Sequence, residues 1–208
     1  MKKTKTILNK PIYAGFAILE LSKLHMYNFH YEFIKEKYGD RAKLLMTDTD
    51  SLTYHIETED LYKDMNENKE LFDFSGYNKD HFCYDNTNNK VLGKFKDETN
   101  GIPIVEFVGL RSKMYSMKLS IEKAKMTGKG IKRQALINKI QHSDYKRCLF
   151  GSERQDKQQL ISFNLIRSSK HQLYTYSLNK VGLCNYDDRR YLLEDGVSSY
   201  AYGHYKTI

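Results

Sequence analysis

Residues 44–56 read LLMTDTDSLTYHI and place two aspartates, Asp48 and Asp50, between short apolar runs. From residue 51 to residue 56, apolar and polar side chains alternate. Period-two runs on both sides of a short polar break predict a β-hairpin with residues 48–50 at or near its tip. Aspartate is a poor strand former, so two aspartates at this place require an explanation.

Two explanations of the aspartates are open. Closely spaced carboxylates concentrate negative charge, and Mg²⁺ is held in proteins by one or two carboxylates together with substrate phosphates. The sequence Asp-Thr-Asp also favours a turn, because aspartate side chains hydrogen-bond their own backbone. An EF-hand loop is excluded. With Asp48 as its first position, Leu52 and Thr53 would stand where that loop needs a ligand and a glycine.

The residues around the aspartates resemble a known motif. Thr47-Asp48-Thr49-Asp50-Ser51 resembles the Asp-Thr-Asp-Ser motif C in the palm of family B DNA polymerases. Residues 110–116, LRSKMYS, resemble the Lys-x-Tyr motif that follows motif C in that family. The similarity extends over essentially the whole chain and ends with residues 186–191 and 200–204. In residues 10–51 and 93–98 it is greatest to the protein-primed branch, which includes viral, organellar and Polinton-type mobile-element polymerases.

The resemblance implies deoxynucleotidyl transfer assisted by two Mg²⁺ ions, in which a primer 3′-hydroxyl attacks the α-phosphate and pyrophosphate leaves. It assigns Asp50 as a direct metal ligand and Asp48 as the second carboxylate of the catalytic site. Thr49 and Ser51 are supporting residues of the motif. The implied partners are primer–template DNA, deoxynucleoside triphosphates and a terminal protein that primes synthesis.

Basic residues are concentrated in the second part of the chain. Residues 126–208 hold 14 Lys and Arg against 7 Asp and Glu, whereas residues 1–125 hold 20 against 19. This distribution suits a polyanion held beside a metal site, although a solvated lysine-rich surface also explains it. By resemblance, Lys113 and Tyr115 contact the primer terminus. The basic stretch around them predicts phosphate contacts from Arg111, Lys129, Lys132 and Arg133.

The remaining patterns predict an α+β fold. Residues 15–38 have helical apolar spacing, and Gly39 follows at a typical helix end. We expect that apolar face to lie in the core. The other expected elements are a short helix near residues 59–65 within a surface connection, strands at 91–96, 102–108 and 113–117, a turn at 99–101, a helix at 134–150, and strands within 158–183. The apolar face comprises Ala17, Leu21, Leu24, Tyr27, Tyr31, Ile34 and Tyr38.

These elements predict two domains. Residues 1–126 would form a partial palm, in which residues 113–117 join the hairpin in one antiparallel sheet packed by helices. Residues 127–208 would form a small mixed thumb that binds DNA, with a hinge at residues 127–130. Tyr191 to Val197 would end in a turn.

Several motifs of an intact polymerase are not found in these 208 residues: the motif A aspartate, motif B for the incoming nucleotide, and the exonuclease motif. Asp73 opens a DFSGY segment that lacks the Ser-Leu-Tyr-Pro part of motif A and follows motif C, so we reject it as a catalytic residue. The sequence therefore predicts a palm-and-thumb fragment that is inactive alone. A non-catalytic nucleic-acid-binding remnant and a metal-dependent nuclease using Asp48 and Asp50 are the alternatives.

Composition indicates an intracellular protein that does not bind a membrane. No apolar run approaches the roughly 18 residues of a transmembrane helix. Residues 1–5 are basic, but the apolar segment of a signal peptide does not follow them. Cys83, Cys148 and Cys184 lack Cys-x-x-Cys spacing, so we expect reduced thiols.

Overall fold

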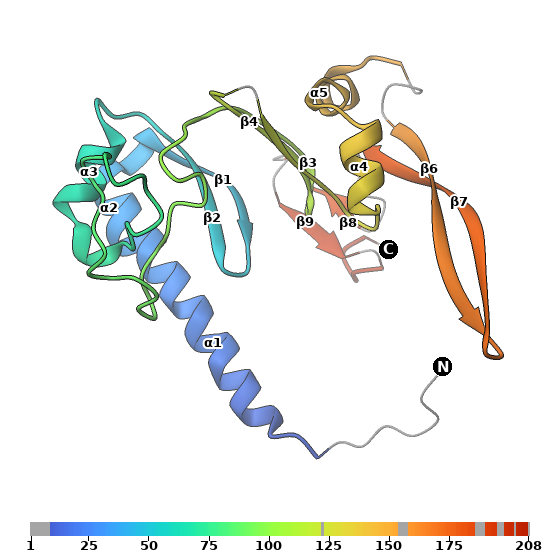
Figure 1. Cartoon of the computed structure of the whole chain (residues 1–208), viewed down its shortest axis with the longest axis horizontal. Helices are drawn as coiled ribbons and strands as arrows, with labels where there is room; N and C mark the ends of the chain where they lie inside the picture. The colour runs from blue at the N-terminus through green and yellow to red at the C-terminus, as the bar shows by residue number, and fades with distance from the viewer. Residues whose placement is uncertain are drawn as a thin grey trace. The chain divides into compact units, whose positions relative to one another are not determined.

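The computed structural model describes residues 9–121, 123–153, 158–185, 190–194, 198–201 and 203–207 (Figure 1). Parts of the sequence interpretation fall outside the described residues, namely residues 1–5 and 195–197. The fold is α+β, with helices and antiparallel sheets. Two compact units divide between Pro103 and Ile104. The boundary expected between residues 126 and 127 instead falls inside strand β5 (Ala124–Gly128), which is hydrogen-bonded to its neighbour along its length.

The unit that precedes Ile104 begins with a long helix. Helix α1 (Ile12–Asn28), a π-helical segment (Phe29–Lys35) and α2 (Glu36–Tyr38) follow one another directly. Gly39, at φ +57°, ends the helix as expected and leads into a 3₁₀ turn (Gly39–Arg41).

The expectation that one apolar face of this helix is buried throughout is wrong. Leu21, Leu24 and Tyr27 are largely exposed, whereas Ile34 and Tyr38 are buried. The wider turn of the π-helical segment rotates the side chains that follow it, so the two parts of the helix do not present the same face. Of the α1 side chains, only Met26 is buried.

Strands β1 (Ala42–Asp48) and β2 (Ser51–Ile56) form the predicted antiparallel hairpin. Its base packs on the helix, where Tyr54 and Ile56 contact the buried cluster of Ile34, Tyr38 and Ala42. The Tyr54 hydroxyl also lies 2.9 Å from Nδ1 of His30. A register shift between Leu44 and Met46 interrupts the expected alternation in β1.

The connection after the hairpin is more ordered than expected. Asp60 caps helix α3 (Leu61–Glu67), because its side chain accepts the backbone N–H groups of Tyr62 and Lys63, and a 3₁₀ turn follows (Lys69–Leu71). Phe72, Phe74, Tyr77 and Cys83 then form a second buried cluster. Residues 91–96 are not the predicted strand. Only Phe95 makes a bridge, to Phe72, because Gly93 at φ +79° turns the chain just before it.

The unit that begins at Ile104 contains a three-stranded antiparallel sheet in the order β3 (Ile104–Arg111), β4 (Met114–Leu119), β5. The expected turn at residues 99–101 precedes it. The prediction that β4 completes one sheet with the β1–β2 hairpin is wrong, because β3 and β5 occupy both edges of β4.

The single helix predicted over residues 134–150 is two helices, α4 (Arg133–Lys139) and α5 (His142–Phe150). Ile140 is extended, and Gln141 and Asp144 form a reciprocal capping box that starts α5. Strands β6 (Gln158–Ser169) and β7 (Gln172–Cys184) then form one long hairpin, and β8 (Arg190–Leu192) pairs with β9 (Ser199–Ala201).

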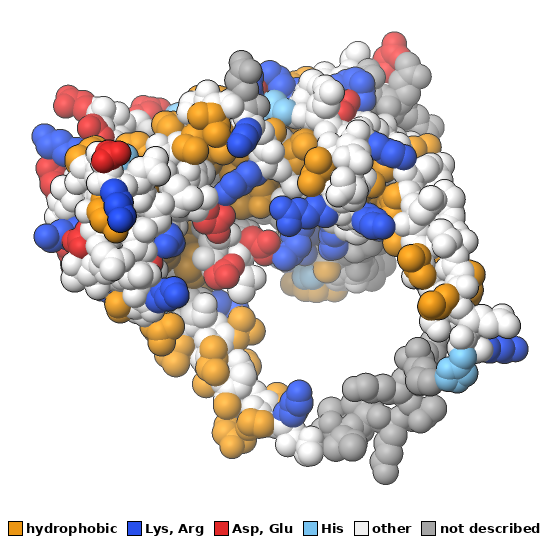
Figure 2. Space-filling model, in the orientation of Figure 1, with side chains coloured by type: hydrophobic (Ala, Val, Ile, Leu, Met, Phe, Trp, Pro, Cys, Tyr) orange, Lys and Arg blue, Asp and Glu red, His pale blue; other side chains and the backbone are white. Residues whose placement is uncertain are grey.

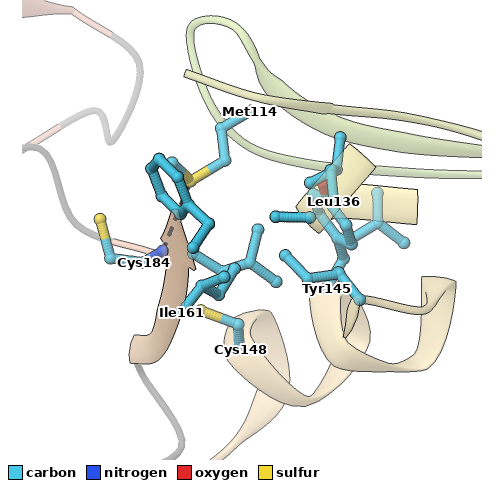
Figure 3. Close-up of a cluster of buried hydrophobic side chains, with 11 residues drawn as sticks. Met114, Leu136, Tyr145, Cys148, Ile161 and Cys184 are labelled. Atoms are coloured by element: carbon cyan, nitrogen blue, oxygen red, sulfur yellow. Dashed lines mark hydrogen bonds between the residues drawn. The ribbon is translucent and has the colours of Figure 1, made fainter. Parts of the chain in front are cut away.

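The core of this unit lies between the sheet, the two helices and the base of the long hairpin (Figure 3). Tyr145 is fully buried, and its hydroxyl donates a hydrogen bond to the Thr127 carbonyl at 3.0 Å. The backbone N–H of Cys184 points at Sδ of Met114 at 3.4 Å. The three cysteines are buried and not disulfide-bonded. Among the described helices, none has the length and apolar character needed to cross a membrane.

Candidate functional site

The acidic hairpin tip is a very tight turn. Asp48 pairs with Ser51, which leaves Thr49 and Asp50 as the loop. The Asp50 N–H donates to the Asp48 carbonyl at 2.6 Å, and Thr49 has φ +54°. This is the hydrogen bond of a γ-turn, and a positive φ is unusual for a β-branched residue. Such a conformation costs about 1–3 kcal/mol.

The two carboxylates at the tip differ in environment. Asp50 is exposed, and within the described residues its side chain makes no hydrogen bond or ion pair; Asp48 is half-buried. The turn is closed by the backbone bond and by Ser51, whose hydroxyl donates to the Asp48 carbonyl at 3.4 Å. Turn chemistry therefore does not account for the Asp50 side chain.

The tip fits a hard cation only in part. The described part of the chain holds no group of three or more His, Cys, Asp and Glu side chains suited to a metal ion. Two neighbouring carboxylates are the ligands that a protein commonly contributes to a Mg²⁺ site, when phosphate oxygens and water supply the other ligands. Thus Asp48 and Asp50 could anchor such an ion but not enclose it.

The strand register gathers predicted basic residues at one end of the β3–β4–β5 sheet. Met114, which starts β4, pairs with Arg111 on β3 and with Gly128 on β5. Lys113 and Lys129 adjoin these paired residues, so they lie at the same sheet end. Lys132 and Arg133 follow at the start of α4. In Figure 2, Lys and Arg side chains gather in this region. We call Arg111, Lys113, Lys129, Lys132 and Arg133 the basic sheet end.

The Lys-x-Tyr pair occupies two different environments. Lys113 is exposed in the β3–β4 turn at φ +59°, not in the strand where it was expected. Tyr115 is half-buried within β4, and its ring packs against Phe107 with centroids 6.0 Å apart. The lysine is therefore placed to meet a ligand, while the tyrosine is partly held by the sheet.

A polar cavity of about 300 Å³ lies between α4 and the β6–β7 hairpin. Lys132 lines it together with Lys139, whose ammonium donates to the Ser162 carbonyl at 2.6 Å. Among the described residues, its other lining groups are amides, hydroxyls, a methyl group and a phenyl ring, without a carboxylate. Sequence reasoning missed these residues, because the fold brings them together from three separate elements. They are Gln134, Ala135, Asn138, Ser162, Phe163, Asn164 and Ser177.

A polar network beside a second cavity, of about 490 Å³, joins β3, β4 and α5. The Ser116 hydroxyl lies 2.7 Å from Nδ1 of His142, and Nε2 of His142 lies 3.1 Å from Glu106. Lys146 bonds the other Glu106 oxygen at 2.6 Å, and this bond lowers the pKa of Glu106. Serine, histidine and glutamate in line suggest a hydrolase, but Ser116 is fully buried and no substrate can reach it. We infer a structural network.

Asp73 is also structural. Its carboxylate accepts the backbone N–H groups of Ser75 and Lys90 and lies 3.5 Å from the Lys96 ammonium. The carboxylate oxygens of Asp73 are thus occupied by contacts within the protein. This agrees with the rejection of Asp73 as a motif A residue.

Comparison with known proteins adds no identification: no family model matches the chain, and no significant match was found among curated proteins or solved structures.

Proposed function

We propose that the chain is the palm-and-thumb part of a nucleotidyltransferase of the family B DNA polymerase type. In this proposal the basic sheet end binds primer–template DNA, and Asp48 and Asp50 hold Mg²⁺. The observation that carries the proposal is the strand register, which brings Arg111, Lys113 and Lys129 to one sheet end. Three cations at one edge suit successive phosphates of a nucleic-acid strand.

Each of these two groups of residues has a defined task. The Mg²⁺ ions would supply Lewis-acid stabilisation of the attacking and leaving oxygens. The exposed carboxylate of Asp50 would ligate an ion directly. The half-buried carboxylate of Asp48 would supply a second negative charge beside that ion. Lys113 would contact a phosphate near the primer end, and Tyr115 would pack beside a sugar or base. Lys132 and Lys139 would hold a backbone phosphate at the polar cavity.

The DNA part is tested by fluorescence anisotropy of a labelled primer–template over a salt series. We expect the Lys113→Gln, Lys129→Gln double variant to bind more weakly, with a salt slope shallower by about 2 because each lost phosphate contact reduces it by about 1. Lys123→Gln is the matched control, because Lys123 is exposed at the opposite end of the same sheet. An unchanged slope in the double variant would remove the basic sheet end from the binding site.

The metal part is tested by amide NMR during a Mn²⁺ titration. We expect paramagnetic broadening of residues 48–51, and much less broadening in Asp50→Asn. Asp40→Asn, in the 3₁₀ turn, serves as a control for general loss of negative charge. Equal broadening in wild type and Asp50→Asn would exclude Asp50 as a ligand.

A non-catalytic nucleic-acid-binding protein is the second candidate, because the basic sheet end needs no carboxylate to bind DNA. Primer extension with Mg²⁺, run beside the binding assay, separates the two candidates. Because the chain is expected to be inactive alone, either extension or Mn²⁺ broadening at the hairpin tip supports the transferase part, whereas binding without either supports the second candidate. Shortening of the template would instead indicate a nuclease.

A further inference from the structure

Helix α1 exposes a largely apolar face. At 3.6 residues per turn, Ile12, Tyr13, Phe16, Leu19, Leu24 and Tyr27 fall within an arc of about 140°. Their exposed fractions run from 43% for Leu19 to 79% for Tyr13. We call these six residues the α1 face. The charged residues within its arc are Glu20 and Lys23, which bond each other at 2.7 Å.

The α1 face is large enough for a stable interface. An aromatic side chain can bury 150–250 Å², so six large side chains at these exposures offer about 800 Å². A typical protein–protein interface buries about 800 Å² on each partner, whereas the largest apolar patch of an ordinary monomer is about 300–600 Å². The size indicates an interaction surface.

The arrangement of the face indicates a second copy of the chain as its occupant. In an antiparallel pair related by a two-fold axis between Leu21 and Ser22, Phe16 stands opposite Tyr27 of the second copy. Leu19 then stands opposite Leu24, and Glu20 opposite Lys23. Four of the six residues of the α1 face thus meet one another, and opposite charges meet at the centre. A parallel pair would place like charges opposite each other, which is unfavourable.

We propose that α1 is the interface of an isologous antiparallel dimer of this chain. In such a dimer the same face serves both copies, so each contact occurs twice. This inference does not depend on DNA or metal binding. It is tested in the absence of both, so its failure and that of the proposed function are distinguishable.

The first experiment is sedimentation equilibrium of the full chain over a range of concentrations. We expect a species with twice the mass of the chain, and at least a tenfold weaker association for Phe16→Asp. Ile18→Asp is the matched control, because Ile18 is similarly exposed but lies on the opposite side of α1. Circular dichroism of each variant establishes that the helix remains folded.

The second experiment tests the central charges. Glu20→Lys places four lysines at the centre of a dimer, and Lys23→Glu places four glutamates there, so each variant alone should be a monomer. Mixing the two should restore association as a heterodimer, because every central contact is then between opposite charges. The bond between residues 20 and 23 within each helix remains broken in the mixture, so recovery reports contact between copies.

Three outcomes would overturn the proposal. The wild-type chain could remain a monomer at all concentrations, in which case another part of this chain or a different protein covers α1. A dimer that Phe16→Asp and Ile18→Asp weaken equally would use another surface. Failure of the mixed charge variants to associate would exclude the antiparallel pairing.

Discussion

The hydroxyl of Ser116 lies 2.7 Å from Nδ1 of His142, and this contact joins the middle of β4 to the first turn of α5. Ser116 is fully buried, and Glu106 on β3 lies at the other side of the imidazole. The contact therefore fixes α5 against the sheet whose end carries the predicted DNA-binding residues.

Replacing Ser116 with alanine should destabilise the chain. The change leaves the partly buried Nδ1 of His142 without its partner, which costs about 1–3 kcal/mol. Urea denaturation measures the effect. Ser143→Ala is the matched control, because Ser143 is exposed in the same helix turn, and it should change stability by about 0.5 kcal/mol or less. Equal midpoints for the two variants would contradict the structural role of the contact.

Gly182 and Gly15 should respond oppositely to alanine. A Cβ at Gly182 in β7 would overlap the side chain of Ile161, which is buried in the core. We therefore expect Gly182→Ala to lower the free energy of unfolding by about 1–3 kcal/mol. At Gly15 in α1 a Cβ meets no other group, so alanine should stabilise by about 0.5–1 kcal/mol through helix propensity. Thermal unfolding of both variants checks the signs. Stabilisation by Gly182→Ala would be inconsistent with the packing of β7 on Ile161.

The sequence was most informative where the structure is local. The hairpin at residues 44–56 and the glycine that ends the first helix were both predicted, because a short-range alternation and a positive-φ position determine them. The α+β class was also predicted. Strand pairing between residues far apart in the sequence was not predicted. The residue pattern of β4 does not show that its partners are β3 and β5 rather than the hairpin.

The candidate site shows the same division. Asp48 and Asp50 were recognised at the hairpin tip because they are adjacent in the chain. Lys139 and Asn164 were missed, because only the packing of α4 on the β6–β7 hairpin brings them to one cavity. The exposure of α1 was missed as well, since a helical period indicates that apolar residues share a face but not what covers it.

Asp73 should make the stability of the chain dependent on acid pH. Burial tends to raise the pKa of its carboxyl, but hydrogen bonds from Ser75 and Lys90 and the Lys96 charge lower it overall. A lowered pKa means that the stabilisation is present above the usual aspartate pKa of about 3.9 and is lost as the pH falls through the folded-state value.

Asp73→Asn removes this charge while keeping the shape of the side chain. We expect the variant to be less stable than wild type by about 1–3 kcal/mol near neutral pH, with the difference shrinking below about pH 4. Denaturant titrations at several pH values measure it. Asp80→Asn is the control, because Asp80 is exposed and its side chain makes no hydrogen bond or ion pair within the described residues. A difference that stays constant with pH would contradict the assignment.

Thr49 should be a site where glycine stabilises the chain. Its φ of +54° is unfavourable for a β-branched residue and natural for glycine, so Thr49→Gly should relieve strain worth about 1–3 kcal/mol. Glycine also increases the entropy of the unfolded chain, which costs up to about 1 kcal/mol and leaves a smaller net gain. Thr47→Gly, in the extended part of β1, has no strain to relieve and should only destabilise. Denaturant unfolding of both variants gives the comparison. If both lose stability equally, the tip does not hold Thr49 at positive φ, and the geometry that places Asp48 and Asp50 around it would have to be abandoned.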